Sequence, residues 1–505
     1  MKLKVRRLAI TTGDIRIVVL GSKDAERMEV YYGDRVSVQK GRKKIVATVD
    51  ITRSQKLLQC CEIGLFEEVF SKLGVKTGEY VDVQLEPKPK SIQYIKKKLE
   101  GKQLTAKEIF TIIEDISEGE LTDIELSYFV SACYSHEMNL PEIVALTKAM
   151  INTGEVLKLK QRKIIDIHCI GGVAGNRTTM IIVPILVAAG LTVPKTSSRA
   201  ITSASGTADT VELLAPVSLS IVEIKRIVNK VGGCMCWGGA VNLAPADDKI
   251  IRVEHPMSLD PTGQLLASIL GKKKSVSASH VLIEIPIGKD SKIESRAHAL
   301  HLKHLFEKVA RQIHLKIKVL IMDGSEPVGN GIGPALEVRD VLWTLLTTTK
   351  KGPEKSSHDC PDLREKSLVL AGETLELAGR VSKGKGYALA QKILESGKAY
   401  ETFCRIIRAQ GGRVPRPEYV RVGRHQITLR AKRSGTVRHV SNTAINKIAR
   451  AAGSPMDKQA GVYLWVHRGD YVKKGKPVMT IYSDNRERLM FAQGVYAKMD
   501  GMVVR

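Results

Sequence analysis

Residues 164–190, IIDIHCIGGVAGNRTTMIIVPILVAAG, decide the fold, because three kinds of segment follow one another within them. Residues 164–170 are an apolar run of the length of a buried strand. Residues 171–175 form a glycine-rich loop, and residues 178–189 are apolar enough for a buried helix. A strand followed by a crossover helix is the repeating unit of a parallel sheet. The stretch therefore predicts the opening of an α/β domain.

The rest of the chain divides around this unit into a multidomain α/β protein. Short strands are predicted at residues 3–10, 15–20, 37–39 and 44–50, and capping boxes at Thr105 with Glu108 and at Thr122 with Glu125. The predicted domains are a β-rich, barrel-like domain at 1–87, a helical domain at 91–162, a central α/β domain with a mostly parallel sheet at 163–346 and a C-terminal α+β domain at 366–505. The polar segment 347–365 is predicted to be a loop or linker.

Length and composition exclude several classes of protein. The chain has 505 residues, 43% hydrophobic and 26% charged, with 42 Gly and 18 Pro, which fits neither a collagen-like nor a wholly disordered chain. The sequence has no apolar run approaching about 18 residues and no recognisable secretory leader, so a cytoplasmic protein is expected.

The eight cysteines are expected to be reduced thiols that hold no metal. They are scattered, and none forms the CxxC pair that begins a zinc ribbon. Cys234 and Cys236 form a CxC motif, but no second pair of Cys or His lies at ligand spacing. We therefore predict that these two side chains pack in the core.

The formal net charge of +26 would attract phosphates and could hold nucleic acid. Residues 405–505 carry 21 Lys or Arg and 6 Asp or Glu. Aromatic residues make up 5% of the chain, and the basic residues are interleaved with strand-like apolar ones, which favours a solvated basic face over a platform for stacking bases. A basic nucleic-acid-binding or scaffold protein remains the alternative from another class.

Two loops carry the residues best suited to chemistry. The glycine loop at 171–175 would direct backbone N–H groups at an anion, although a plain strand-to-helix turn is the alternative, and no Walker motif is present. Residues 197–209, SSRAITSASGTAD, contain six hydroxyls and one Arg, which suit phosphate and sugar hydroxyls, although an ordinary Ser/Thr-rich loop is also possible. Ligands of α/β sheets bind beyond the carboxyl ends of the strands, where both loops are expected.

These loops resemble a known family. DIHCIGGVAGN (166–176), SSRAITSASGTADTVE (197–212) and NLAPADDKIIRVEHPMSLDP (242–261) are similar to the type 2 thymidine and pyrimidine nucleoside phosphorylases, and within them to the archaeal AMP phosphorylase branch. The similarity covers nearly the whole chain and includes residues 322–324 and 337–339. The first 87 residues are themselves a mark of that branch.

The resemblance implies phosphorolysis, in which inorganic phosphate attacks the anomeric carbon while the base departs. It implies a pentosyltransferase that converts AMP, and also CMP and UMP, into the free base and ribose 1,5-bisphosphate, in nucleotide salvage and AMP catabolism. Phosphate would be a co-substrate, with no metal or organic cofactor, no membrane and no nucleic acid as partner. A homodimer or larger homo-oligomer is expected.

The resemblance also implies roles for individual residues. Asp260 falls on the family's proton donor, although the sequence alone favours an Asp in an ordinary turn. The implied AMP contacts are Gly172, Ser198, Arg199, Ala200, Ile201, Thr202, Ser203, Thr207, Ser268 and Lys292. The implied phosphate contacts are Gly171, Thr179, Ser197 and Thr207. For Lys292 a solvated surface position is the alternative.

Departures from the pyrimidine enzymes favour AMP. Where those enzymes carry Lys-His-Ser before the glycines, this chain has Ile167, His168 and Cys169, and where they carry a base-reading Arg it has Glu254. A thymidine or uridine phosphorylase remains the enzymatic alternative. Cys169 also departs from the Ser usual in the AMP branch, and its weaker hydrogen bonding would lower phosphate affinity. His168 could contact the base or sit as a core imidazole.

A phosphoribosyltransferase of the anthranilate type is a further alternative with a similar lobe arrangement. It would need pairs of acidic residues to bind magnesium, and Asp247 with Asp248 is a candidate pair. That pair belongs to the LAPADD segment shared with the phosphorylases, so it does not favour the transferase.

Overall fold

The computed structural model describes the chain except for residues 14, 201–202, 242, 258, 347–358 and 500. The chain forms two compact units. The first comprises Met1–Thr153 and Pro245–Gln264, and the second comprises Gly154–Ala244 and Leu265–Arg505. Within the described ranges, each helix is too short or too polar to cross a membrane.

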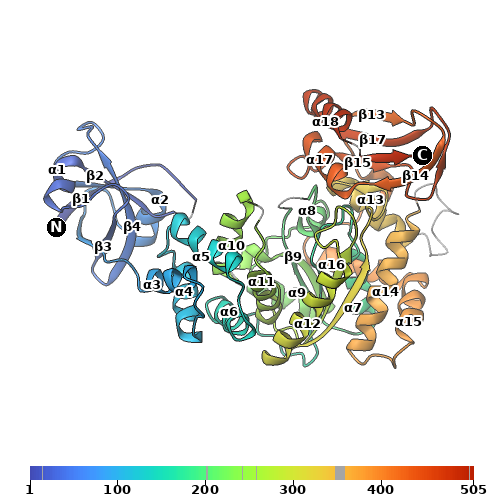
Figure 1. Cartoon of the computed structure of the whole chain (residues 1–505), viewed down its shortest axis with the longest axis horizontal. Helices are drawn as coiled ribbons and strands as arrows, with labels where there is room; N and C mark the ends of the chain where they lie inside the picture. Colours follow the sequence, from blue (N-terminus) through green and yellow to red (C-terminus); the bar gives the residue numbers. More distant parts are fainter. Residues whose placement is uncertain (14, 201–202, 242, 258, 347–358, 500) are drawn as a thin grey trace. The chain divides into compact units, whose positions relative to one another are not determined.

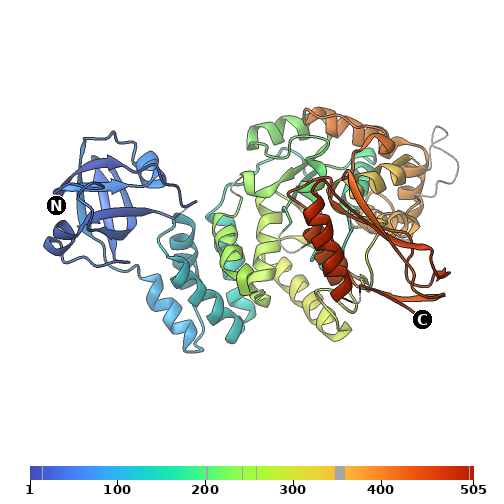
Figure 2. The same ribbon diagram turned by 90° about the horizontal axis from the view of Figure 1, so that it is seen from above.

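The first unit begins with a closed six-stranded barrel (Figure 1, Figure 2). Its strands, in the order β1-β5-β2-β4-β3-β6, are β1 (Lys2–Arg7), β5 (Glu62–Leu65), β2 (Ile17–Gly21), β4 (Lys43–Thr52), β3 (Arg35–Lys40) and β6 (Tyr80–Leu85). Alternate residues point inward, as Leu3 and Val5 of β1 do, so the barrel interior is apolar. Two short helices, α1 (Ser22–Arg27) and α2 (Glu67–Leu73), follow β2 and β5.

Helices complete the first unit. They are α3 (Ser91–Leu99), α4 (Ala106–Glu118), α5 (Asp123–Ser135), α6 (Leu140–Asn152) and α10 (Pro245–Glu254), with a short 3₁₀ turn η2 (His255–Met257) after α10. The predicted capping boxes at Thr105 and Thr122 are confirmed, since each hydroxyl accepts a backbone N–H and each Glu reaches back. Lys98 and Glu142 form a buried ion pair at 3.0 Å that joins α3 to α6.

The second unit contains the predicted parallel sheet. β7 (Ile165–Cys169), β10 (His280–Ile287) and β11 (Lys316–Asp323) lie in the order β11-β10-β7, all parallel. β8 (Val193–Ser197) and β9 (Gly233–Trp237) form a second parallel pair, and a bridge between Ile164 and Thr192 links it to β7. The carboxyl ends of β7 and β8 lead into the glycine loop and the Ser/Thr loop, respectively.

The second unit also contains helices outside its C-terminal region. They are α7 (Thr179–Ala188), α8 (Thr207–Val211), α9 (Ile221–Val231), α11 (Thr262–Ser275, whose first three residues belong to the first unit), α12 (Arg296–Gln312), α13 (Pro334–Leu346), α14 (Pro361–Leu377), α15 (Gly386–Glu395) and α16 (Lys398–Ala409). One large apolar core joins Ile185 of α7 and Leu282 of β10 to Leu375 of α14 and Phe403 of α16. Helices that follow the predicted linker therefore pack on the core that precedes it.

The linker prediction was partly wrong. Residues 361–365 belong to α14, because Pro361 occupies the first turn of the helix, where a missing N–H costs no hydrogen bond. Residues 347–358 lie outside the described part of the chain.

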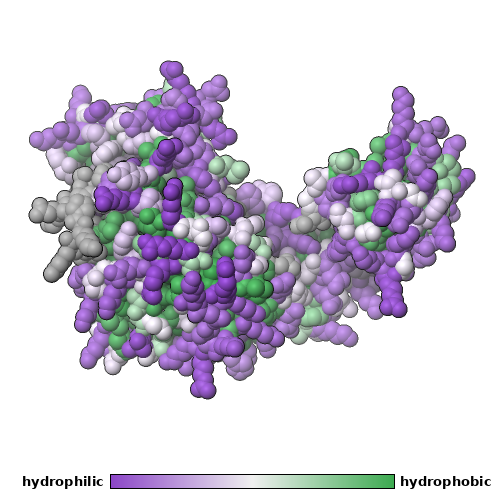
Figure 3. All heavy atoms as spheres, turned by 180° about the vertical axis from the view of Figure 1, so that it is seen from behind, coloured by the Kyte–Doolittle hydropathy of each residue, from purple (hydrophilic) through white to green (hydrophobic). Residues whose placement is uncertain are grey.

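The C-terminal region is α+β, as expected, with an apolar core of its own. One antiparallel sheet holds β12 (Gly331–Ile332), β15 (Gly461–Leu464), β17 (Pro477–Ser483) and β13 (His425–Arg430). A second holds β16 (Tyr471–Val472), β14 (Gly435–Val440) and β18 (Met502–Val504). The helices α17 (Asn442–Ala452) and α18 (Arg486–Lys498) pack on this core. On the face of the molecule drawn in Figure 3, hydrophilic residues cover most of the surface, with apolar residues between them.

Candidate active site

The glycine loop after β7 needs glycine at two adjacent positions. Gly171 and Gly172 have φ values of +93° and +92°, in the left-handed region that side chains disfavour. A Cβ on Gly172 would lie 2.3 Å from the backbone N of Lys292, so only glycine lets these two backbones meet. The Gly171 N–H donates to Cys169 Sγ at 3.4 Å. The loop is thereby closely packed against the segment that carries Lys292.

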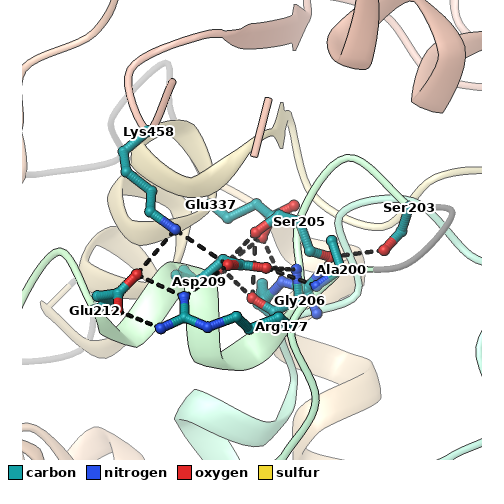
Figure 4. Close-up of polar contacts among 11 residues, drawn as sticks. Arg177, Ala200, Ser203, Ser205, Gly206, Asp209, Glu212, Glu337 and Lys458 are labelled. Carbon is teal, nitrogen blue, oxygen red and sulfur yellow. Dashed lines mark hydrogen bonds and ion pairs between the residues drawn. The ribbon is translucent and has the colours of Figure 1, made fainter. Parts of the chain in front are cut away.

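A buried carboxylate shapes the Ser/Thr loop after β8. Asp209 Oδ2 accepts the N–H groups of Ala200 at 2.7 Å and Gly206 at 3.0 Å (Figure 4). A Cβ on Gly206 would lie 2.6 Å from the Ala200 nitrogen, so the two ends of the loop are in close contact. The loop is therefore folded back on itself and held by the first turn of α8.

The Arg199 guanidinium lies among acidic and aromatic partners. It pairs with Glu212 at 2.5 Å and Asp209 at 3.2 Å, and its carbon lies 4.9 Å from the centre of the Trp237 ring. Lys458 reaches the same two carboxylates, Glu212 at 3.0 Å and Asp209 at 3.1 Å (Figure 4). The hydrogen bond from Arg199 is the main reason that the pKa of Glu212 falls to about 2. Arg199 thus holds the loop in shape.

A buried network lies beneath this loop. The Arg177 guanidinium pairs with Glu337 and donates to the carbonyl of Ser205. Thr210 Oγ1 donates to Glu337 Oε2 at 2.9 Å and shares a hydrogen bond with Ser205 Oγ at 2.8 Å. The network ties the start of α7 to α8 and α13. Sequence analysis did not assign a role to Arg177 or Thr210, since their shared partner Glu337 lies more than 120 residues further along the chain.

Helix α17 contacts both loops, which the sequence analysis also missed. Asn442 Oδ1 accepts the N–H of Ala174 at 2.9 Å, while its amide donates to the carbonyl of Gly324. Asn446 Oδ1 accepts the N–H of Ala204 at 3.0 Å, and Arg450 donates to the carbonyl of Ser203 at 3.0 Å. One helix of the C-terminal region therefore fixes the backbone of the glycine loop and of the Ser/Thr loop.

The structure places most of the predicted site residues in the second unit. Gly171 and Gly172 follow β7, Thr179 opens α7, Ser197 ends β8, and Ser198, Arg199, Ala200 and Ser203 follow it; Thr207 opens α8, Ser268 lies on α11, and Lys292 follows β10. Ile201 and Thr202 lie outside the described residues. Asp260 belongs to the first unit, where it is half-buried in the short segment that follows η2 in the sequence, and its role stays a prediction.

The side chains of His168 and Cys169 are both uncharged at neutral pH. The pKa of His168 lies well below its usual value because of burial and the nearby positive charges of Lys273 and Lys195. Burial also raises the pKa of the Cys169 thiol. Cys169 Sγ accepts from the Asn176 amide at 3.4 Å as well as from Gly171. The thiol therefore holds the glycine loop as a hydrogen-bond acceptor.

One thiol and carboxylate cluster lies in the barrel of the first unit. Among the described residues, Asp24, Cys60 and Cys61 are the group whose potential metal-ligand atoms all lie within 4.8 Å of one another. Asp24 already accepts the Cys61 N–H at 2.8 Å and pairs with Arg27 at 3.6 Å. These contacts explain the cluster as packing between α1 and the segment before β5.

Three segments of the chain match known domain families. Residues 92–154 match the helical bundle domain of the glycosyl transferase family, and residues 161–261 match its α/β domain. Residues 436–499 match the C-terminal domain of pyrimidine nucleoside phosphorylases. The matched order is that of a helical domain, an α/β domain and a C-terminal domain.

Curated relatives cover nearly the whole chain. AMP phosphorylase 1 of Archaeoglobus fulgidus is 47% identical over 473 residues, which are 94% of this chain and 91% of the relative. The AMP phosphorylase of Pyrococcus furiosus is 44% identical over 97% of this chain and 95% of its own length. That of Methanocaldococcus jannaschii is 41% identical over 100% of this chain and 98% of its own.

A solved structure is similar in fold. Anthranilate phosphoribosyltransferase from Thermus thermophilus superposes with a TM-score of 0.50 and 19% sequence identity, over 63% of this chain and 99% of that one. This likeness shows a phosphoribosyltransferase-like fold, in agreement with the fold class expected from the sequence. At that identity it shows the fold alone.

Proposed function

Because this chain belongs to the AMP phosphorylase family, we propose that it catalyses the phosphorolysis of AMP by inorganic phosphate. The observation that carries the proposal is the identity of 41–47% over nearly the full length of three AMP phosphorylases. The enzyme is a glycosyltransferase of the pentosyl type, and the thymidine or uridine alternative is not favoured. The products would be adenine and ribose 1,5-bisphosphate.

In the proposed reaction, phosphate binds where β7 and β8 end. Backbone N–H groups of the glycine loop and nearby hydroxyls supply donors for its oxygens, from Gly171, Thr179, Ser197 and Thr207. The close packing of Gly172 against the backbone of Lys292 supports this, because it holds the donors rigidly before substrate arrives. The AMP contacts proposed are Gly172, residues 198–203, Thr207, Ser268 and Lys292.

The bond changes balance without a redox partner. A phosphate oxygen forms the new bond to the anomeric carbon as the bond to the base nitrogen breaks, and its electron pair leaves with the base. Asp260 would donate a proton to an imidazole nitrogen of adenine, so that the base leaves neutral. Phosphate is thus a co-substrate, and the proposed mechanism gives no chemical step to a cofactor.

The experiment that tests the function compares substrates. Free base is measured after incubation with phosphate and AMP, CMP, UMP, adenosine or thymidine, in chelator-treated buffer. We expect phosphate-dependent release from the nucleotides and none from the nucleosides, because the relatives act on a nucleotide and Glu254 stands where the pyrimidine enzymes carry Arg. Release from thymidine alone would contradict the proposal. Loss of activity in the chelator, with recovery on adding a metal, would contradict the absence of a cofactor.

Replacing Cys169 with Ser is expected to strengthen phosphate binding modestly. A hydroxyl makes stronger hydrogen bonds than a thiol and is smaller, so it can hold the Gly171 N–H and also donate towards the loop. We expect the KM for phosphate to fall by roughly two- to fivefold, with kcat little changed, as one improved hydrogen bond is worth about 0.5–1 kcal/mol. Initial rates against phosphate concentration measure this. Cys404→Ser, on α16, is the matched control. An unchanged or raised KM would refute the predicted effect of Cys169.

The remaining expectations concern the setting of the enzyme. We propose a homodimer or larger homo-oligomer in the cytoplasm, with small molecules as its ligands. Size-exclusion chromatography with light scattering measures the mass of the assembly, and the mass of a single chain would contradict the proposed oligomer. Tight, strongly salt-dependent retention on DNA or RNA would instead favour the nucleic-acid alternative raised by the net charge of +26.

A further inference from the structure

A charged cluster is buried between the two loop-bearing strands and α11. Asp166 of β7 is 0% exposed, Lys195 of β8 is 4% exposed, and Lys273 of α11 is 3% exposed. Lys273 Nζ lies 2.8 Å from Asp166 Oδ2, and Lys195 Nζ lies 3.5 Å from Asp166 Oδ1. Lys195 Nζ also donates to the carbonyl of Thr196 at 2.7 Å. Two lysines therefore share one carboxylate away from water.

The charges in this cluster do not balance. The buried pair in the first unit, Lys98 with Glu142, matches one cation with one anion, as buried ion pairs usually do. The Asp166, Lys195 and Lys273 cluster instead holds one positive charge in excess when both lysines are protonated. Burial of an uncompensated charge is costly, and the cost is relieved either when one lysine loses its proton or when an anion binds nearby.

The excess charge lies next to the proposed site. Side chains two residues apart on a strand share a face, so His168 follows Asp166 and Ser197 follows Lys195 on the same sides of their strands. The His168 imidazole feels the positive charges of Lys273, Lys195, Lys292 and Lys272, in that order of size. The field of the buried lysines therefore reaches the carboxyl end of β7, where the glycine loop begins.

We propose that Lys195 and Lys273 are positioning residues whose shared positive charge, beneath the glycine and Ser/Thr loops, is completed by the anionic phosphoryl group of a bound substrate. The proposal rests on the proposed function, since it assigns the anion to phosphate or to the 5′-phosphate of AMP. Residues 164–175, which include β7 and the glycine loop, contain no Lys or Arg, so this segment supplies no positive charge to a bound anion. Both lysines act through their electric field, and Lys195 also acts through β8, the strand that leads into the Ser/Thr loop.

The charge of Lys273 titrates near physiological pH. Burial, opposed by the Asp166 carboxylate and assisted by Lys195, lowers the pKa of Lys273 to about 8. The other groups around the cluster do not offset this loss. His168 is neutral at this pH. The Cys234 thiol of β9 keeps its proton, because the neighbouring Cys236 and burial raise the pKa of Cys234. The second positive charge is therefore present below about pH 8 and lost above it.

The test uses the full-length chain and three substitutions. Lys273→Met removes the titrating charge and leaves Lys195 with Asp166 as a balanced pair, so folding should not be impaired. Lys273→Arg keeps a positive charge at all accessible pH values. Lys230→Met, on the exposed side of α9, is the matched control. For each, kcat, the KM for phosphate and the KM for AMP are measured from pH 6.5 to 9.5, together with thermal unfolding.

We expect wild-type KM for one of the two anions to rise by roughly tenfold as pH increases through 8, after correction for the ionisation of phosphate itself. Lys273→Met should show the raised KM at pH 7 with no further rise, at an unfolding temperature equal to or above that of wild type. Lys273→Arg should keep the low KM to pH 9. The KM that moves identifies the source of the anion, as inorganic phosphate or AMP.

Two results would overturn the proposal. One is a Lys273→Met protein with a lower unfolding temperature and unchanged KM values, which would make the cluster structural. The other is an alkaline rise in KM that persists in Lys273→Arg. If wild type releases no base from AMP, the proposed function fails, but the cluster is still tested by the rise in unfolding temperature that phosphate or AMP produces. That rise should be smaller in Lys273→Met than in Lys230→Met.

Discussion

Asp260→Asn is expected to lower kcat for AMP phosphorolysis by roughly 10²–10⁴-fold, the range that positioned general acids contribute. The amide has nearly the shape of the carboxyl group but cannot give a proton to the departing base. The KM values should change little, because the substitution removes an interaction made only as the bond to the base breaks. Initial rates at saturating AMP and phosphate measure the loss, and calorimetry checks that AMP still binds.

If Asp260 is the proton donor, its loss should matter less for a base that leaves easily without a proton. A nucleotide whose base carries an electron-withdrawing substituent departs more readily without protonation, so Asp260→Asn should slow it less than it slows AMP. Asp123→Asn is a suitable control in the same unit, because it alters only an exposed pair with Arg252. Equal slowing of all substrates would show that Asp260 positions the substrate, and an unchanged kcat would place the proton donor elsewhere.

The parallel core could be predicted because its signal is local. Residues 164–190 contain the strand, the glycine turn and the helix in one stretch, and the structure has β7 and α7 within one residue of the predicted bounds. The capping boxes at Thr105 and Thr122 could be predicted for the same reason, since the two residues of each box lie only three positions apart. In the barrel, β5, β6 and the helices α1 and α2 were missed. The two helices are too short to show a clear helical period, whereas β6 (YVDVQL) has the alternation of a strand and could have been found.

The supports of the candidate site could not be predicted, because they join distant parts of the chain. Asn442 and Asn446 of α17 hold loops 268 and 242 residues away, and an Asn in a helix is no signal for such a contact. The Lys195 and Lys273 cluster is of the same kind. Each lysine is unremarkable in sequence, and their shared carboxylate on β7 is visible only when the three elements are packed together.

Gly172→Ala is expected to lower kcat/KM for AMP on the order of 100-fold, far more than Gly171→Ala. Both glycines have φ near +92°, so each alanine introduces a similar backbone strain of about 1–2 kcal/mol. A Cβ on Gly171 would meet nothing within 4 Å, whereas on Gly172 it would lie 2.3 Å from the Lys292 nitrogen. Displacement of reacting groups by about 1 Å can cost 10²-fold in rate. Steady-state kinetics and thermal unfolding of the two variants measure the difference.

Comparing Gly171→Ala with Gly172→Ala separates the effect of backbone strain from the effect of the contact with Lys292. If strain alone mattered, Gly171→Ala and Gly172→Ala would lose similar stability and activity, which would refute the role given to the packing of Lys292 against the loop. Because the nearest atom to the new Cβ is a backbone nitrogen, shortening the Lys292 side chain cannot make room for it. The double variant Gly172→Ala/Lys292→Ala should therefore be no more active than Gly172→Ala. Recovery of activity in the double variant would show that the Lys292 side chain, rather than the backbone of its loop, is what Gly172 accommodates.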